Sequence, residues 1–94
     1  MNIEKLIEIA CEIVGCSVDE FHNSSKRNSA ATARKFVSYY LYDNGYRNEK
    51  IAEAIGYSKN IVSYNHQRFK TMKNNPDIQY MYSIFMDEVG KMKQ

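Results

Sequence analysis

Hydrophobic residues recur at intervals of three and four along most of the chain, the spacing that gathers side chains on one face of an α-helix. The first such stripe lies within residues 2–14 and is followed by Gly15, a suitable C-terminal stop. A second long stripe covers residues 29–43 and ends at Asn44-Gly45, a pair suited to a left-handed cap. No stretch of convincing length alternates as a β-strand does. The pattern predicts an all-α protein, a compact bundle of five to six helices in which the 29–43 helix is the central buried one.

Polar residues at the breaks between the stripes predict where further helices begin. Ser17 and Glu20 have the spacing of a capping box, in which each side chain accepts a hydrogen bond from the backbone amide of the other. A short helical turn is expected to follow Ser17. Asn75 and Pro76 are expected to open the last helix, which covers about 76–92, because asparagine is a good cap and proline fits the first helical position.

Between these long helices, two shorter stripes are separated by a glycine. Asn48 is expected to cap a helix that stops at Gly56, and Ser58 to cap the next helix, which extends to about residue 70. Ala52 is small where the second helix must approach, and Gly56 can adopt the positive φ of a sharp turn. This combination predicts a helix-turn-helix over about 48–70, although a simple helical hairpin satisfies the same pattern. We expect residues 1–94 to form a single domain.

Positive charge is concentrated in the middle of the chain. Residues 1–25 contain one lysine and five acids, residues 26–73 contain ten lysines and arginines and three acids, and residues 74–94 contain two lysines and three acids. The net charge of +2 therefore conceals a strongly cationic central block. Such a block favours a polyanion such as nucleic acid as the partner.

The cysteines and histidines do not have the spacing of a metal site. Cys11 and Cys16 lack further cysteine partners, and His22 and His66 complete no four-ligand zinc pattern, so we predict two reduced thiols, no metal and no cofactor. Cys11 belongs to an apolar stripe and is expected in the core, whereas Cys16 is expected to be partly exposed.

Enzymatic activity is the least favoured interpretation. The neighbouring carboxylates in Asp19-Glu20 and Asp87-Glu88 diverge on a helix, and neither histidine has an evident nucleophile beside it. No small-molecule substrate is therefore expected. The chain shows no membrane-spanning stretch and does not begin like a signal sequence, so we expect a cytoplasmic location and no membrane partner.

The second helix of the 48–70 pair contains residue types that can read base edges. If Val62 faces inward, helical spacing turns a set of hydrogen-bonding side chains outward. Asparagine and glutamine can pair with adenine, and lysine can donate to guanine or phosphate in the major groove of double-stranded DNA. The expected base-contacting residues are Ser58, Lys59, Asn60, Ser63, Tyr64 and Gln67.

Cationic residues outside that helix are candidates for contact with the DNA backbone. Contacts with phosphates or with a neighbouring minor groove set position and affinity rather than sequence preference. The expected residues are Lys26, Arg27, Arg34, Lys35 and Arg47.

The order of these segments resembles a known family over nearly the whole chain. The residues that carry the resemblance are Ile13-Val14, Val18-Asp19-Glu20-Phe21, Lys26-Arg27, Ala33-Arg34-Lys35, Tyr40-Leu41, Ile51-Ala52-Glu53-Ala54-Ile55-Gly56 and Val62. They resemble the C-terminal DNA-binding domain of DnaA-type chromosomal replication initiators, whose fold is related to that of the Trp repressor. The resemblance implies sequence-specific DNA binding in a bacterial or phage setting, linked to replication initiation or its regulation.

By position, the resemblance assigns minor-groove or phosphate contact to Arg27 and Arg34. It assigns base contact to Ser58, Lys59 and Asn60. The chain departs from the family's signature run, Gly-Arg-Asp-His-Thr-Thr-Val, of which only the glycine and the valine are retained. The corresponding run here is Gly56-Tyr57-Ser58-Lys59-Asn60-Ile61-Val62. It gives no support for recognition of the family's usual origin box.

No Gly-rich phosphate loop of the kind found in nucleotide-hydrolysing domains occurs among the four glycines, so we expect the chain to act as a DNA-binding domain only. A homodimer, or a complex with a replication or regulatory protein, is compatible with this interpretation. The alternative is a helical interaction module that keeps the fold without binding DNA. Its partner surface would consist of Tyr39, Tyr42, Tyr46, Tyr80, Tyr82, Met81 and Met86.

Overall fold

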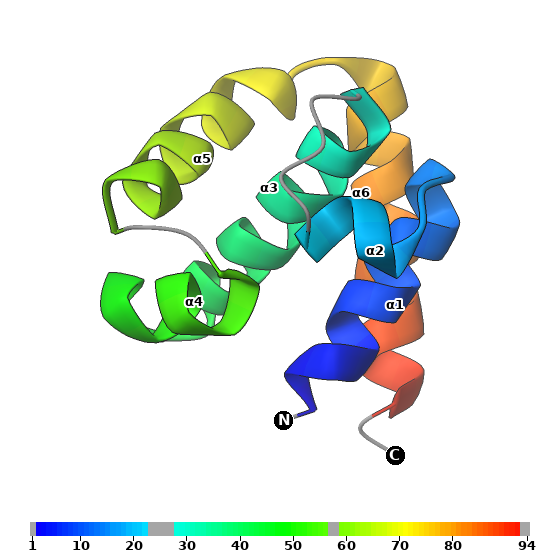
Figure 1. Cartoon of the computed structure of the whole chain (residues 1–94). Helices are drawn as coiled ribbons and strands as arrows, with labels where there is room; N and C mark the ends of the chain where they lie inside the picture. Colours follow the sequence, from blue (N-terminus) through cyan, green and yellow to red (C-terminus); the bar gives the residue numbers. More distant parts are fainter. Residues whose placement is uncertain (1, 23–27, 57–58, 93–94) are drawn as a thin grey trace.

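Six helices make up the described part of the chain, residues 2–22, 28–56 and 59–92 of a computed structural model (Figure 1). In chain order they are α1 (Ile3–Val14), α2 (Val18–His22), α3 (Asn28–Asp43), α4 (Asn48–Ile55), α5 (Lys59–Met72) and α6 (Pro76–Met92). No strand occurs within these ranges. The expected all-α bundle is therefore confirmed.

The predicted helix ends are formed by local hydrogen bonds. The Ser17 hydroxyl accepts from the Glu20 amide at 3.0 Å, and the Glu20 carboxylate accepts from the Ser17 amide at 3.1 Å, which confirms the capping box. At the start of α6, the Asn75 side chain accepts a 2.9 Å bond from the Asp77 amide. These bonds satisfy first-turn amides that have no partner within the helix.

Like Gly15 at the end of α1, two further glycines end helices in the left-handed conformation. Gly45 follows α3 with a φ of +89°, and the Tyr46 amide donates back to the Leu41 carbonyl at 3.0 Å. Gly56 follows α4 with a φ of +81°, and its amide donates to the Ala52 carbonyl at 2.8 Å. The positive φ expected at both positions is confirmed.

The predicted cap of α4 is wrong. Arg47 is the cap residue and makes no side-chain capping bond, while Asn48 is the first helical residue. The Asn48 side chain instead donates through Nδ2 to the hydroxyl oxygen of Ser63, 2.9 Å away on α5. The Asn48 side chain thus bonds to the neighbouring helix α5 rather than capping its own helix. The predicted cap at Ser58 lies outside the described residues.

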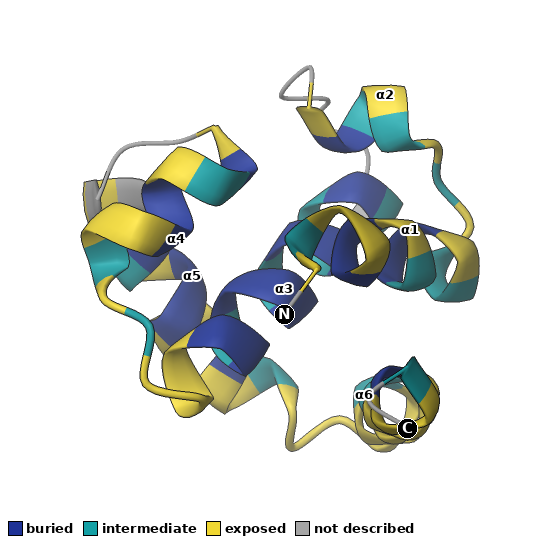
Figure 2. Cartoon of the chain, turned by 90° about the horizontal axis from the view of Figure 1, so that it is seen from below, coloured by how far each residue is buried: buried dark blue, intermediate teal, exposed yellow. Residues whose placement is uncertain are grey.

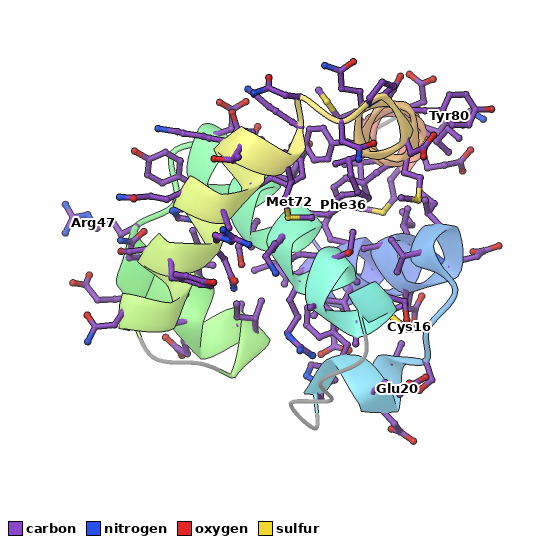
Figure 3. All side chains as sticks on the ribbon, turned by 90° about the horizontal axis from the view of Figure 1, so that it is seen from above. Cys16, Glu20, Phe36, Arg47, Met72 and Tyr80 are labelled. Atoms are coloured by element: carbon purple, nitrogen blue, oxygen red, sulfur yellow. The ribbon has the colours of Figure 1, made fainter. Side chains whose placement is uncertain are left out.

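The core surrounds α3, which packs against α1, α2, α4 and α5. Figure 2 shows buried residues on the inner sides of these helices, whereas α6 is exposed around most of its circumference. The Phe36 ring lies at the centre, edge-on to Phe69 at 5.6 Å and to Tyr82 at 5.4 Å between ring centroids (Figure 3). The expected central burial of the 29–43 helix is thereby confirmed.

The two cysteines behave as their positions in the pattern predict. Cys11 is buried, Cys16 is partly exposed, and both are free thiols. Burial, together with the neighbouring Cys16 thiol, raises the pKa of Cys11 to about 12. Cys11 is therefore protonated and unreactive at neutral pH.

Candidate nucleic-acid interface

Helix α5 has one face in the core and one in solvent. Val62, Asn65, His66 and Phe69 are buried, at positions that follow one another at intervals of three, one and three residues. This is the inner stripe of an α-helix, and it confirms that Val62 faces inward. The remaining positions of α5 are thereby turned away from α3.

The His66 imidazole helps to hold α5 on α3. Its Nε2 lies 3.1 Å from the Ser38 carbonyl oxygen, and its ring lies 4.3 Å from the Tyr42 ring between centroids. Burial lowers the pKa of His66 below its usual 6.5, an effect that the nearby Lys70 reinforces and the Ser38 carbonyl opposes. The neutral imidazole is thus the form that the packed structure favours.

The outer face of α5 presents polar side chains to solvent. Asn60, Tyr64 and Gln67 are exposed, Tyr64 by 59%. The seven residue steps from Asn60 to Gln67 span about two helical turns, or about 10 Å along the axis. Three of the predicted base-contacting residues therefore lie on one open helical face.

Arg68 belongs to this face and was missed by the sequence analysis. It is exposed, and its guanidinium carbon lies 5.9 Å from the centroid of the Tyr64 ring, a cation–π arrangement one turn apart. Spacing alone could have identified it, since Arg68 follows Tyr64 by four residues. No acidic residue occurs between Lys59 and Lys73, so the face carries positive charge only.

Ser63 lies at the edge of this face, half-buried where α4 meets α5. Its oxygen accepts the bond from Asn48, which leaves the hydroxyl proton able to donate elsewhere. Ser58 lies outside the described residues, and so does the side chain of Lys59. The predicted base-contacting set is thus described at four of its six positions.

Lys35 extends the positive charge from α5 to α3. Its side chain is half-buried, and burial lowers its pKa, with further lowering by the positive charges of Arg34 and Arg68. Lys35 on α3 and Arg68 on α5 therefore belong to one cationic cluster.

Arg34 differs from the exposed phosphate-contacting residue that we expected. It is only 9% exposed, and its Nη1 donates to the Phe21 carbonyl at 3.1 Å and to the Glu20 carbonyl at 3.3 Å. These carbonyls belong to the last turn of α2, where carbonyl groups lie beyond the hydrogen-bond ladder of a helix. Arg34 thus anchors α2 to α3. Its place in the apolar stripe, four residues after Ala30, is a signal that could have indicated burial.

The other predicted backbone contacts are only partly described. Arg47 is exposed on the connection between α3 and α4, and Figure 3 shows its side chain extending away from the core. Lys26 and Arg27 lie outside the described residues. Within the described ranges, no three His, Cys, Asp or Glu side chains gather into a group that could hold a metal ion. None of the helices there is long and apolar enough to cross a bilayer.

Comparison with known proteins adds no assignment: no protein-family model matches the chain, and no curated protein sequence matches it.

Proposed function

We propose that this chain binds double-stranded DNA, with the outer face of α5 in the major groove. The observation that carries the proposal is the open face of α5, on which Asn60, Gln67 and Arg68 are exposed together. A face that carries positive charge only attracts a polyanion such as DNA. The cluster of Lys35 and Arg68 adjoins this helical face, which has no acid and is rich in hydrogen-bonding groups.

In this proposal the outer residues of α5 have separate roles. Asn60 and Gln67 read base edges, since a carboxamide can donate to and accept from adenine in the major groove. Arg68 and Lys35 contact phosphates and set the position of the helix. Arg47, exposed on the connection that precedes α4, adds a further phosphate contact.

The α4–α5 pair supplies the scaffold, which we propose to be a helix-turn-helix. Gly56 ends α4 in the left-handed conformation, Ala52 is buried, and the Asn48–Ser63 bond fixes α5 against α4. The resemblance to DnaA-type initiators extends the proposal to replication initiation or its regulation, in the cytoplasm of a bacterial or phage-infected cell.

Fluorescence anisotropy with labelled duplexes at several salt concentrations tests the proposal. A selection from random duplexes first supplies the preferred sequence. Asn60→Ala and Gln67→Ala should each cost about 1–3 kcal/mol on that sequence only, because they remove base contacts. Arg68→Ala should weaken binding to all duplexes and reduce the salt slope by about one unit, because it removes a phosphate contact.

Lys91→Ala on α6 is the matched control. It removes the same charge as Arg68→Ala. Lys91 lies on α6, not α5, and pairs there with Glu88 at 3.1 Å. Its affinity and salt slope should remain those of the original chain. Absence of binding below about 10⁻⁴ M at low salt contradicts the proposal.

A protein-interaction module remains the second candidate function. Tyr42, Tyr80 and Met86 are large, apolar in body, and exposed by 48%, 70% and 47%. Exposed aromatic and methionine side chains are typical of protein interfaces. This candidate would be favoured if the chain did not bind DNA and if Tyr80→Ala or Met86→Ala abolished its binding to a partner protein.

A further inference from the structure

A groove lies between the end of α5 and one side of α6, with Tyr39 of α3 also in its lining. Its cavity volume is about 440 Å³. Tyr39 and Tyr82 form its aromatic wall, with 5.9 Å between ring centroids, and Met86 stands half-exposed on its α6 side. The exposed Tyr80 lies on the same helix, where Figure 3 shows it extending from the bundle. The face thus contains both a recess and protruding apolar side chains.

The groove also carries one charge of each sign. Lys73 and Asp87 both line it and both are exposed. The Lys73 ammonium is held in place, since its Nζ donates to the Tyr39 hydroxyl at 3.1 Å and lies 5.2 Å from the centroid of that ring. Neither Lys73 nor Asp87 forms an ion pair with another part of the described chain.

Gly90 is a third observation on the same helix. It lies inside α6, seven residues after the groove residue Ser83 and so on nearly the same helical face. A Cβ atom built on Gly90 meets nothing within 4 Å, and the φ of Gly90 is not left-handed. Glycine weakens a helix relative to alanine, and the fold of one chain gives no packing reason for it. The close approach of a second backbone would supply that reason.

We propose that a second copy of this chain docks on this face, with α6 against α6 across a two-fold axis. A two-fold interface is self-complementary, and a patch that contains a recess, a protrusion and both signs of charge satisfies that condition. Lys73 of one copy then faces Asp87 of the other, twice per dimer, and Met86 enters the groove of the partner copy. This inference does not depend on DNA binding.

Sedimentation equilibrium of the intact chain, without DNA, tests the proposal. The original chain should form dimers with a dissociation constant below about 0.5 mM. Lys73→Glu and Asp87→Lys should each raise that constant at least about tenfold, because each change creates two repulsive pairs. The double variant Lys73→Glu/Asp87→Lys should return to within about threefold of the original constant, because it restores both pairs in reverse.

Matched charge reversals on α4, Lys50→Glu and Glu53→Lys, should leave the dissociation constant unchanged, since α4 lies on the other side of α3 from α6 (Figure 1). Circular dichroism checks that every variant is folded. Gly90→Ala does not destabilise the helix itself, because alanine favours a helix more than glycine does. An increase in the dimer dissociation constant of this variant therefore reports on the interface alone. A chain that stays monomeric up to about 0.5 mM overturns the proposal. Failure of the double variant to restore dimers overturns it as well.

Discussion

The side-chain amide of Asn48 donates a 2.9 Å hydrogen bond to the Ser63 hydroxyl and so connects the first turn of α4 to the edge of α5. The two residues are fifteen positions apart, and the bond is partly buried. It fixes the relative position of the two helices in the proposed helix-turn-helix. This bond thus sets the orientation of the outer face of α5 relative to α4.

We expect Asn48→Ala and Ser63→Ala each to lower the free energy of unfolding by about 1 kcal/mol, because each removes this bond. The double variant should lose less than the sum of the two, since the bond can be lost only once. Urea denaturation followed by circular dichroism measures all three values. Asn60→Ala, the same change at an exposed position of α5, should stay within about 0.5 kcal/mol. Additive losses would show that the bond contributes nothing.

Arg34→Met should lower the free energy of unfolding by about 2–3 kcal/mol. The change keeps a long apolar stem but leaves the Glu20 and Phe21 carbonyls without their charged donor. The exposed Arg47→Met provides the control, with an expected change within about 0.5 kcal/mol. Equal effects of the two substitutions in urea would rule out the anchoring role of Arg34.

Stability should fall as the pH is lowered through the region in which His66 titrates. Burial lowers the pKa of His66 from 6.5 in the folded chain, so the unfolded chain binds the proton more tightly. The stabilising effect is complete above about pH 6.5 and is lost as the pH falls toward the folded-state pKa. Urea midpoints at about pH 7.5 and 5.5 should therefore differ, and the difference should shrink in His66→Gln. His22→Gln, which removes an exposed imidazole, should retain the difference between the two urea midpoints. An unchanged difference in His66→Gln contradicts this account.

Two glycine-to-alanine changes should have opposite effects on stability. Gly56→Ala should lower the free energy of unfolding by about 1–2 kcal/mol, because a Cβ atom is strained at a φ of +81°. Gly90→Ala should raise it by about 0.5–1 kcal/mol, because the position is helical and open. Thermal unfolding at a concentration at which the chain is monomeric compares the two. A loss of stability in Gly90→Ala would mean that the chain itself needs glycine there.

Lys35→Ala should weaken duplex binding about as much as Arg68→Ala, although the two residues lie on different helices. Both are expected to contact phosphates from one cationic cluster, so each loss should flatten the salt dependence by about one unit. Anisotropy titrations from low to moderate salt provide the measurement. A normal salt slope for Lys35→Ala would restrict the interface to α5.

The amino-acid sequence by itself determined the local structure of this protein. Hydrophobic spacing and cap residues together identified every helix, and the capping box at Ser17 and Glu20 and the glycines after α3 and α4 marked where helices begin or end. These features depend on residues no more than about five positions apart, so the chain contains their causes side by side. The open face of α5 followed in the same way, once Val62 was assigned to the inner side.

Only the tertiary structure decided which polar side chains have partners. Arg34 donates to carbonyls thirteen and fourteen residues away, and Asn48 bonds across to α5 instead of capping its own helix. Lys35 lies within electrostatic range of Arg68, and the groove beside α6 forms, because helices distant in sequence pack on one core. Spacing within a helix gives the side on which a residue lies, but the neighbour on that side depends on the packing of the whole bundle.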